Sequence, residues 1–343
     1  MDGARGPQAR HRHDRARRTL MARWAIVGTG DISARLLTDL RATPGTAVTA
    51  VWGRDELRTK EFAAAHGIET STFDRAALLA REDVDIVYIA TPAHTHRAIA
   101  IEALEAGKHV LVEKPMATSA RDVEDIFDAA ARADRFAMEA MWMRFNPLHV
   151  DIRGRIESGE IGTPTGVRAS FGTPFFPRPR VQRPEQGGSS LLDRGIYAVT
   201  LGHWFLGEPT AVHAQATFVD GVDVRGHATL EHERGFTQIA WSSMEFLDLS
   251  AAVAGEHGWI SIDPMFWAGT SAKVHAGSME RIFQAPGPVS HPRVGNGYGP
   301  MLRSVEDALS AGMRQHPAHD APATIAVART LDLILGAAAR PTP

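Results

Sequence analysis

His109-Val-Leu-Val-Glu-Lys-Pro115 is the stretch that decides the fold of this chain. Its apolar residues follow one another without a polar residue between them, which is typical of a strand covered on both faces in a parallel sheet. Pro115 cannot continue a central strand and ends it. Glu113 and Lys114 therefore stand at a carboxyl end, where open parallel sheets bind ligands. Taken alone, the Glu-Lys pair fits a surface turn equally well.

The composition is that of an ordinary globular protein, and its length favours two domains. The 343 residues are 44% hydrophobic and 22% charged, with a net charge of −3, so we expect neither nucleic acid nor a membrane as a partner. Cysteine is absent, which excludes disulfides and thiolate chemistry. No long uncharged apolar run is present, so we expect no segment that spans a bilayer, and we expect a cytoplasmic protein. Residues 1–22 are rich in arginine and poor in apolar residues, which predicts a disordered extension.

An apolar strand at 24–28 is followed by the glycine turn Gly28-Thr-Gly-Asp-Ile-Ser33 and then by a helical apolar pattern. Strand, glycine turn and helix are the context of the dinucleotide-binding fingerprint. Gly28 allows the tight turn, and Gly30 lets backbone N–H groups approach a pyrophosphate at the helix N-terminus. We favour nucleotide binding over a plain turn. The expected cofactor-binding residues here are Gly28, Gly30, Asp31 and Ile32.

The end of the second strand indicates which dinucleotide is bound. This strand, at 47–53, is followed by Arg54 and then Asp55. An acid at this place holds the ribose hydroxyls in NAD enzymes and repels a 2′-phosphate, whereas arginine pairs with that phosphate. Arg54 therefore favours NADP as the cofactor. The alternative is that Arg54 is solvated and Asp55 binds the ribose of NAD.

Strands and helices alternate up to about residue 140, which predicts a doubly wound parallel sheet in an α/β fold. Thr91-Pro92, Glu113-Lys114 and the glycine turn then all follow strand carboxyl ends and line one crevice, which favours an active site over a surface ion pair. The remaining expected strands are 85–90, 109–113 and 136–140, and the expected helices are 55–66, 74–81, a helix ending at 106, and 118–133.

Asn146-Pro147 marks a break, and we place the domain boundary there. The dinucleotide-binding domain is expected at 23–145 and a second α/β domain at 146–343. After a helix at 148–158, most segments look like strands joined by short turns, which predicts a large, mostly antiparallel sheet. The expected strands are 165–171, 211–219, 225–232, 236–243, 247–254 and 259–262, and the closing helices are 301–312 and 321–339.

One helix, at 191–206, interrupts these strands, with Ser189 or Ser190 as its cap. Asp193 and Tyr197 are four residues apart in it and share a face. Either both line a site, or the tyrosine belongs to the core and the aspartate is a first-turn helix charge. Spacing alone leaves this open.

Several motifs occur together in one order, and in this combination the chain resembles the Gfo/Idh/MocA oxidoreductase family from about residue 24 to the C-terminus. The runs Met138–Pro147 and Asp193–Tyr197 resemble the branch of dimeric dihydrodiol dehydrogenases and NADP-dependent D-xylose dehydrogenases. Two positions depart from the family pattern, Ala93 after Thr91-Pro92 and Ser33 in the fingerprint. The motifs are Gly28-Thr-Gly30, Ala90-Thr-Pro92 with His96, Glu113-Lys-Pro115, Gly159-Glu-Ile-Gly162 and Gly187-Gly-Ser-Ser-Leu-Leu-Asp-Arg-Gly-Ile-Tyr197.

The resemblance implies a Rossmann domain followed by an α/β domain whose open sheet often forms the dimer interface, so we expect a homodimer or homotetramer through that sheet. It implies a nicotinamide cofactor, with a catalytic lysine at Lys114, a second acid/base residue at Tyr197 and the family acid at Asp193. The further expected cofactor-binding residues are Thr91, Pro92, His96, Glu113 and Lys114, and the expected substrate-binding residues are Trp142, Arg144, Asp193 and Tyr197.

The expected reaction is hydride transfer between the nicotinamide and a secondary alcohol or carbonyl of a sugar, polyol or diol. Tyr197 would exchange the proton, and Lys114 would lower the pKa of the phenol, which titrates near 10 when free, and polarise the substrate oxygen. Asp193 would orient Lys114 or accept a sugar hydroxyl. Arg144 is either part of the pocket wall or a structural ion-pair partner. The scattered histidines show no metal-ligand spacing, and no metal is expected.

Two alternatives remain. One is a reductase of another sugar, such as an anhydrofructose. The other is a non-catalytic, NADP-sensing regulator on the same fold. The presence of both Lys114 and Tyr197 argues against the regulator, because a sensor needs neither proton donor.

Overall fold

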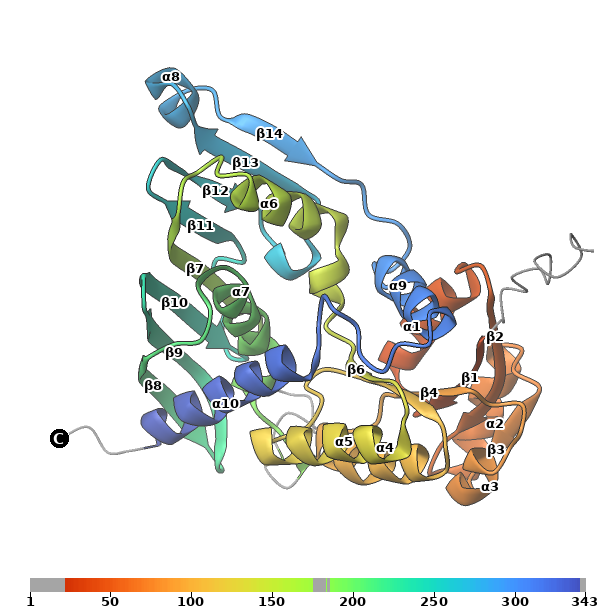
Figure 1. The fold of residues 1–343 in the computed structure, drawn as a ribbon. Helices are drawn as coiled ribbons and strands as arrows, with labels where there is room; N and C mark the ends of the chain where they lie inside the picture. Colours follow the sequence, from red (N-terminus) through yellow and green to blue (C-terminus); the bar gives the residue numbers. More distant parts are fainter. Residues whose placement is uncertain (1–21, 175–182, 184–185, 340–343) are drawn as a thin grey trace, which may run out of the picture.

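The computed structural model describes residues 22–174, 183 and 186–339 of the chain. The predicted N-terminal extension, residues 1–22, lies outside the described residues except for Ala22, which begins the first strand. Figure 1 shows the described chain as two α/β units side by side, each built around one sheet.

The first sheet is parallel and has six strands in the order β3-β2-β1-β4-β5-β6. The winding reverses between β1 and β4, which is where doubly wound sheets bind nucleotides. The predicted parallel sheet is confirmed, and the unpredicted β3 is too short to carry a periodic pattern. The strands are β1 (Ala22–Val27), β2 (Thr46–Trp52), β3 (Thr70–Thr72), β4 (Ile86–Ile89), β5 (His109–Val112) and β6 (Ala137–Glu139).

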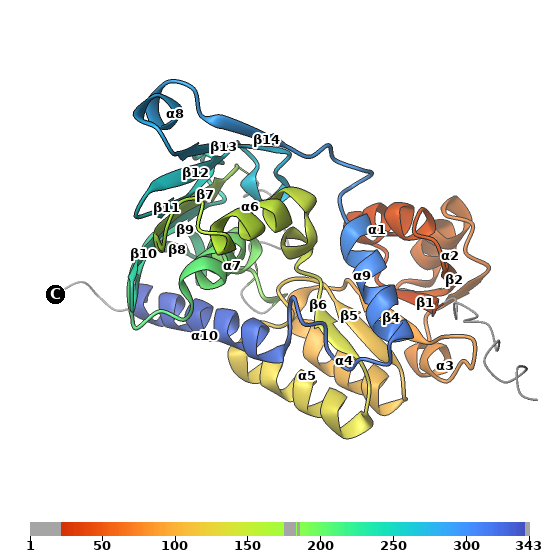
Figure 2. The ribbon, with the colours of Figure 1, turned by 45° about the horizontal axis from the view of Figure 1, so that its top comes forward.

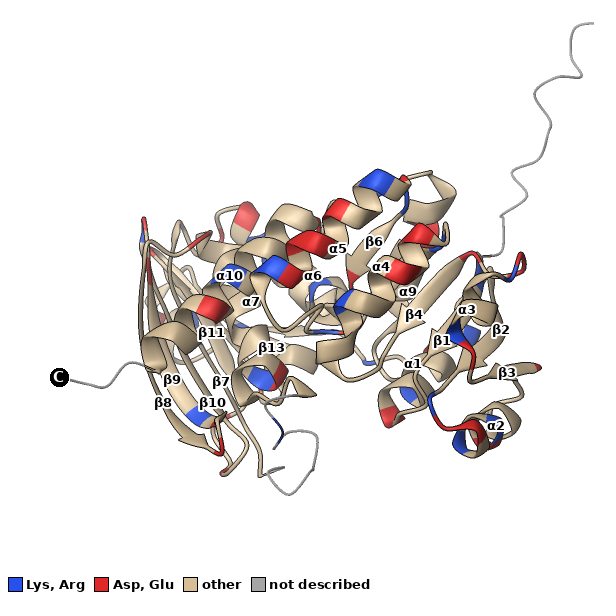
Figure 3. Cartoon of the chain, turned by 90° about the horizontal axis from the view of Figure 1, so that it is seen from below, with Lys and Arg blue, Asp and Glu red and all other residues tan. Residues whose placement is uncertain are grey.

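Helices cover both faces of this sheet, α1 and α2 on one and α3 to α5 on the other. Side chains of Asp55, Asp74 and Ser119 cap three of them by accepting a backbone N–H of the first turn. Figure 3 shows α4 and α5 side by side with acidic and basic residues on both, and Arg97 of α4 pairs with Asp125 of α5 at 2.8 Å. The helices are α1 (Asp31–Arg41), α2 (Glu56–Ala65), α3 (Arg75–Leu79), α4 (His96–Glu105) and α5 (Ala120–Ala133).

The second sheet has eight strands in the order β14-β13-β12-β11-β7-β10-β9-β8. Only β7 and β10 pair in parallel, so the predicted open, mostly antiparallel sheet is confirmed, and β13 and β14 extend it beyond the predicted strands. The strands are β7 (Pro164–Gly172), β8 (Ala211–Val219), β9 (Val222–His232), β10 (Gly235–Ser242), β11 (Ala251–Gly255), β12 (Gly258–Ile262), β13 (Ser271–Ala276) and β14 (Gly287–Ser290).

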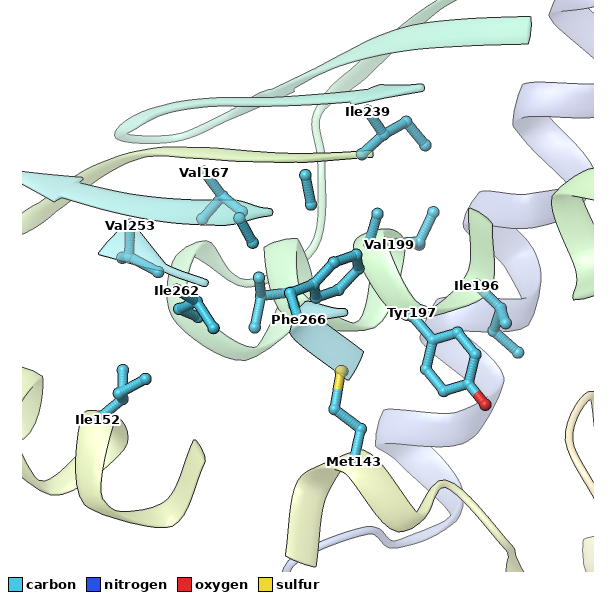
Figure 4. Close-up of a cluster of buried hydrophobic side chains, with 14 of the residues drawn as sticks. Met143, Ile152, Val167, Ile196, Tyr197, Val199, Ile239, Val253, Ile262 and Phe266 are labelled. Carbon is cyan, nitrogen blue, oxygen red and sulfur yellow. The ribbon is translucent and has the colours of Figure 1, made fainter. Parts of the chain in front are cut away.

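The long helices of the second domain pack on one face of this sheet (Figures 1 and 2). Figure 4 shows the core between them, where Val167 and Ile239 of the sheet face Val199 of α7. On the opposite face, exposed residues such as Arg168 and Ala254 alternate with the core residues, and among the described helices only α8 packs there, at one corner. The helices are α6 (Pro147–Glu157), α7 (Ile196–Leu206), α8 (Met279–Phe283) and α10 (Ala321–Ala338).

α9 (Gly299–Ser310) belongs to the first domain in space although it follows the second sheet in sequence. Its apolar residues share a core with Trp24 of β1, and Glu306 accepts a hydrogen bond from the Trp24 indole at 2.7 Å. Both ribbon views place α9 beside α1 (Figures 1 and 2). The predicted division into 23–145 and 146–343 is therefore wrong for this helix, because the chain returns to the first domain after β14.

α10 packs against both domains, touching α5 of the first and α7 and β8 of the second. Its 18 residues and mean hydropathy of 1.3 would suffice for a membrane span by length and composition. Leu331 and Ile334 are buried in the core of the second domain, so the helix packs against the rest of the protein along part of its surface.

Candidate active site

Lys114 lies just beyond the end of β5, and its ammonium reaches the second domain. Its Nζ donates to the Asp193 carboxylate at 3.0 Å and to the backbone carbonyl of the same residue at 2.7 Å. Burial disfavours the charged form, but Asp193 and other nearby groups outweigh it and raise the pKa of Lys114 above its usual 10.5. The side chain is therefore a cation throughout the physiological pH range.

The backbone that carries Asp193 is a π-helical turn. The sequence predicts one helix over 191–206, whereas the structure has a π turn at Leu191–Gly195 that continues as α7. Hydrogen bonds in a π turn close five residues back instead of four, and such turns are frequent at functional sites. The widened turn brings both the carboxylate and the carbonyl of Asp193 to Lys114.

Two acceptors fix the start of this turn. Ser189 Oγ accepts the backbone N–H of Leu192 at 3.1 Å, as expected of a capping serine. The buried carboxylate of Asp223, on β9, accepts the backbone N–H of Leu191 and the indole N–H of Trp241, each at 2.8 Å. Asp223 therefore ties the turn to the second sheet, and no local sequence pattern marks it for this role.

Tyr197 faces Lys114 from the next turn of the helix. Lys114 Nζ lies 5.1 Å from the centroid of the phenol ring, and Trp142 Nε1 donates to the hydroxyl at 3.2 Å. This bond occupies a lone pair of the oxygen, so the O–H hydrogen is available to a ligand. Figure 4 shows the hydroxyl at the margin of the apolar core, pointing away from it.

The expectation that the pKa of Tyr197 is lowered is wrong as a net effect. Burial raises the pKa of Tyr197 above its usual 10.0, and Lys114 opposes this shift without cancelling it. Lys114 acts in the predicted direction, but the loss of solvent is the larger contribution. The phenol therefore keeps its proton at neutral pH and is a proton donor in that state.

Glu113, directly before Lys114, is also buried. The hydroxyl of Tyr88 donates to its Oε1 at 2.5 Å, and the backbone N–H of Lys114 donates to its Oε2 at 3.1 Å. Burial raises the pKa of Glu113 to about 7, although both neighbours oppose the shift. This carboxyl group therefore changes its protonation near neutral pH.

His96 ties the ends of β4 and β5 together. Its Nε2 lies 2.8 Å from the carbonyl oxygen of Thr91, and its Nδ1 lies 3.0 Å from that of Pro115. Burial lowers the pKa of His96 against the effect of these carbonyls, so the neutral ring donates to one of them at a time. Both ring nitrogens thus face backbone, and the side chain supports the turn after Lys114.

These residues border a cleft of about 510 Å³ at the strand carboxyl ends, between the two domains. Aromatic side chains that the sequence analysis did not single out form much of its wall. Phe171 stacks on Trp267 with ring centroids 3.5 Å apart, and Tyr298 lies against Trp142 at 5.5 Å. Their positions are scattered along the chain and give no local signal. The predicted site residues in the lining are Ile32, Thr91, Pro92, His96, Glu113, Lys114, Trp142, Asp193 and Tyr197.

Arg144 lies outside this lining, and its prediction as a substrate-binding residue is corrected. Its guanidinium is 4.9 Å from the ring centroid of Trp204 and 3.5 Å from His319 Nδ1. Burial lowers the pKa of Arg144 to about 10. The geometry fits the structural alternative, although its closest partners are rings rather than a carboxylate.

Glu139, at the end of β6, supports the Lys114 turn from within the first domain. Its Oε1 accepts the backbone N–H of Met116 at 2.9 Å, and its Oε2 lies 2.9 Å from His319 Nε2. All of these groups are buried. Glu139 is not among the residues predicted from the sequence, although its position as an acid at the end of a buried strand, like that of Glu113, could have indicated it.

The glycine turn provides a place for an anion at the start of α1. Gly28 has φ of +118°, and a Cβ there would lie 2.6 Å from the carbonyl oxygen of Ala90. Gly30 offers no side chain to cap α1 and has open space at its Cβ position. Helix N-termini of this kind bind phosphate groups. The turn therefore fits the pyrophosphate of a dinucleotide, while Asp31 is exposed beside it.

The end of β2 is basic. Asp55 Oδ1 accepts the backbone N–H of Arg58 at 2.8 Å and caps α2, so its carboxylate serves the helix. Arg54 is exposed and has no hydrogen bond or ion pair to a described residue. Arg58 Nη2 donates to the carbonyl of Thr29, in the glycine turn, at 3.2 Å. Arg58 is not among the residues predicted from the sequence, although its place on the first turn of α2, four residues after Arg54, could have indicated it.

A Rossmann domain binds a nicotinamide dinucleotide through the sheet order, the glycine turn and the uncapped helix start that are seen here. The fold and the cleft together are therefore those of an NAD(P)-dependent oxidoreductase. The chain belongs to the Gfo/Idh/MocA family. Residues 22–141 match the model of the oxidoreductase family with an NAD-binding Rossmann fold, and residues 149–261 match that of the GFO/IDH/MocA C-terminal domain. The resemblance drawn from the motifs is confirmed. Within the described residues, no group of three His, Asp or Glu side chains is placed to hold a metal ion.

Relatives match over most of the chain. The trans-1,2-dihydrobenzene-1,2-diol dehydrogenase of Xenopus laevis is 33% identical over 307 residues, which cover 87% of this chain and 92% of that protein. The human enzyme of that name is 31% identical over 304 residues, with 86% and 90% covered. A 3-ketoreductase from Actinomadura kijaniata, solved with NADP and TDP-benzene, has a TM-score of 0.81 at 27% identity over 92% of this chain and 97% of that chain. Levoglucosan dehydrogenase, solved with NADH and levoglucosan, shares the fold with a TM-score of 0.85 at 20% identity over 93% and 97%.

The contact between Lys114 and Asp193 predicts a change in the ammonium pKa. In Asp193→Asn the side chain keeps its size and loses its negative charge. The carboxylate then no longer stabilises the buried ammonium, so the pKa of Lys114 falls. The chain holds only the lysines Lys60, Lys108, Lys114 and Lys273, so ¹³C NMR with lysine labelled at Cε resolves this titration. Lys114→Met assigns the signal, and Lys60 serves as the internal control. An unchanged Lys114 titration would show that the carboxylate does not hold the charge.

Proposed function

We propose that this chain transfers a hydride between NADP and the CH–OH or carbonyl carbon of a cyclic diol, sugar or polyol, with Lys114, Tyr197 and Asp193 as its catalytic residues. The observation that carries the proposal is the meeting of an ammonium from the first domain and a phenol from the second in one cleft, with Lys114 Nζ 5.1 Å from the Tyr197 ring centroid. Such a pair can exchange a proton with a substrate oxygen and stabilise the negative charge that develops there.

The reaction requires one proton to be delivered to the substrate oxygen or removed from it. The bound nicotinamide supplies the hydride chemistry. Tyr197 gives its hydroxyl proton to the carbonyl oxygen during reduction and takes it back during oxidation. Lys114 stabilises the negative charge that develops on the two oxygens, and Asp193 holds the ammonium in place. Oxidation requires the deprotonated phenol and therefore accelerates as the pH rises toward the raised pKa of Tyr197.

The cleft lining supports a cyclic substrate that carries hydroxyl groups. The flat rings of Phe171 and Trp267 offer an apolar face to a ring, and the Asp193 carboxylate, 46% exposed, can accept a hydroxyl hydrogen. The names of the relatives point the same way, because dihydrobenzenediol is a ring with two neighbouring hydroxyl groups. The first experiment follows NADPH absorbance with a panel of trans-diols, aldoses and ketoses.

The rival from another class is an NADP-sensing regulator, which needs the dinucleotide site but neither the buried ammonium nor the phenol. Tight NADPH binding without turnover on any member of that panel would replace the enzyme proposal. Turnover on neutral diols or sugars would support it.

The proposal includes a homodimer through the open face of the second sheet, or a tetramer built from such dimers. Phe236, which is 44% exposed, and Ala254 lie among the exposed residues of the strands. Charged Arg168 and Glu231 stand on the same face. This mixture of apolar and charged residues suits an interface between two copies of the chain.

Replacing either member of the proposed catalytic pair should abolish most turnover. We expect Lys114→Met and Tyr197→Phe each to lower kcat by roughly 10²- to 10⁴-fold, because each removes a group that acts on the substrate oxygen. The NADPH dissociation constant, measured by calorimetry, should change little. Lys60→Met removes an exposed ammonium outside the cleft lining and is the matched control for Lys114→Met, with near-normal kcat expected. Near-normal rates in Lys114→Met would refute the assigned role.

Cofactor preference should depend on the basic end of β2. Arg54→Ala and Arg58→Ala should each weaken NADPH binding by roughly tenfold, because a charge-assisted bond to the 2′-phosphate is lost, and leave NADH binding nearly unchanged. Asp55→Asn keeps a capping oxygen and serves as the control. Equal losses for NADPH and NADH would show that these arginines do not read the 2′-phosphate.

The oligomer should depend on the centre of the open sheet face. We expect the protein without substitutions to sediment as a dimer or tetramer. Ala254→Arg, on β11, should shift the equilibrium toward the monomer, because it would place two guanidinium groups in the interface. Ala80→Arg adds the same charge to an exposed position in the first domain and should leave the oligomer intact. A monomeric unchanged chain, measured by analytical ultracentrifugation, would exclude the dimer.

A further inference from the structure

The charges in the cleft do not balance. Its lining includes the basic residues Arg35, Lys114, Arg194 and Arg293 and the acidic residues Glu113 and Asp193. Asp193 already pairs with Lys114 at 3.0 Å and with Arg194 at 3.7 Å. Arg35 and Arg293 are exposed and have no ion pair with a described residue. The cleft therefore presents two guanidinium groups to whatever binds there.

These two arginines come from different parts of the fold and are joined through one residue. Arg35 lies on α1 of the first domain, and Arg293 lies in the segment that leads from β14 back to α9. Arg293 Nη2 donates to the backbone carbonyl of Asn296 at 2.5 Å, and Asn296 Nδ2 donates to the backbone carbonyl of Arg35 at 3.1 Å. The Arg293 guanidinium is thus held within its own segment, and that segment is tied to the backbone of Arg35.

Asp39 holds this segment against α1. Its carboxylate accepts the backbone N–H groups of Asn296 and Tyr298, both at 2.8 Å, and is only 4% exposed. Gly295 has φ of +59°, and a Cβ there would collide with Asp39 Oδ1, so the approach requires glycine. A buried carboxylate is costly unless hydrogen-bond donors replace its water, as these N–H groups do. The contact between Asp39 and this segment therefore determines where Arg293 lies.

We propose that Arg35 and Arg293 together bind the pyrophosphate of the dinucleotide, with Asp39 as the positioning residue for Arg293. Ile32, which lines the cleft, is one helical turn before Arg35 on α1 and directly after the start of the helix, where the glycine turn leaves room for phosphate. Two guanidinium groups match the two negative charges of a pyrophosphate diester. The segment between β14 and α9 then contributes to cofactor binding.

The same chemistry, an oxyanion, could also come from an acidic group of the substrate. We favour the pyrophosphate because Arg35 lies on the helix that begins at the glycine turn. The two sources are separated by measuring cofactor binding without substrate and then comparing neutral with acidic sugars. The proposal concerns cofactor binding alone, so it can fail while the proposed catalytic pair stands, and the reverse also holds.

The test is calorimetric titration of the full chain with NADPH and with adenosine 2′-monophosphate, which lacks the pyrophosphate. Arg35→Ala and Arg293→Ala should each raise the dissociation constant of NADPH by roughly tenfold, and leave that of adenosine 2′-monophosphate nearly unchanged. Arg293→Lys should recover part of the loss, because it keeps the charge. Arg303→Ala, on the exposed side of α9 and outside the cleft lining, is the matched control and should bind NADPH normally.

Asp39→Asn tests the positioning role. It should weaken NADPH binding. The double variant with Arg293→Ala should bind NADPH no more weakly than Arg293→Ala alone, because both changes remove the contact between Arg293 and the cofactor. Unchanged NADPH binding in both arginine variants would overturn the proposal. A rise in KM for acidic sugars only, with normal NADPH binding, would overturn it in favour of the substrate. Equal weakening of NADPH and adenosine 2′-monophosphate binding in the arginine variants would also overturn the proposal, since that result indicates a general loss of the binding site.

Discussion

A single ammonium joins the two domains at the place where the chemistry is proposed. Lys114 leaves the parallel sheet at the end of β5, and the carboxylate and carbonyl of Asp193 receive its Nζ from the π turn of the second domain. Because the ammonium has lost most of its water, it requires these acceptors. The phenol of Tyr197 is carried by the same helix, so the contact that holds the cation also sets the distance between the two proposed catalytic groups.

The turn that presents Lys114 is held by polar side chains that bind backbone. Glu113 accepts the N–H of Lys114, His96 faces the carbonyl of Pro115, and Glu139 accepts the N–H of Met116. These residues come from three strand ends of the first sheet, and each is buried. Buried polar groups of this kind cost free energy unless they are satisfied, so the network has little freedom to change its shape. Lys114 is thereby presented on a rigid base.

The chain crosses between its domains more often than a division into two units suggests. The second domain supplies Asp193, Tyr197 and the stacked rings of Phe171 and Trp267, and the segment that returns to α1 supplies Tyr298 and Arg293. Asp39 locks that segment to the first domain through contacts with residues more than 250 positions away in sequence. The cleft is consequently a product of both domains, and its charge and aromatic lining are set where they meet.

Sequence alone determined the parallel sheet, the glycine turn and the end of β5 at Glu113-Lys114, because apolar periodicity and the breaks at glycine and proline are local. Only the tertiary structure decided that α9 joins the first domain, that Arg144 turns away from the cleft and that Glu139 supports Lys114. It also decided the protonation of Tyr197, since burial outweighs the nearby cation. These properties depend on contacts between distant segments and on the exclusion of water, which no local pattern encodes.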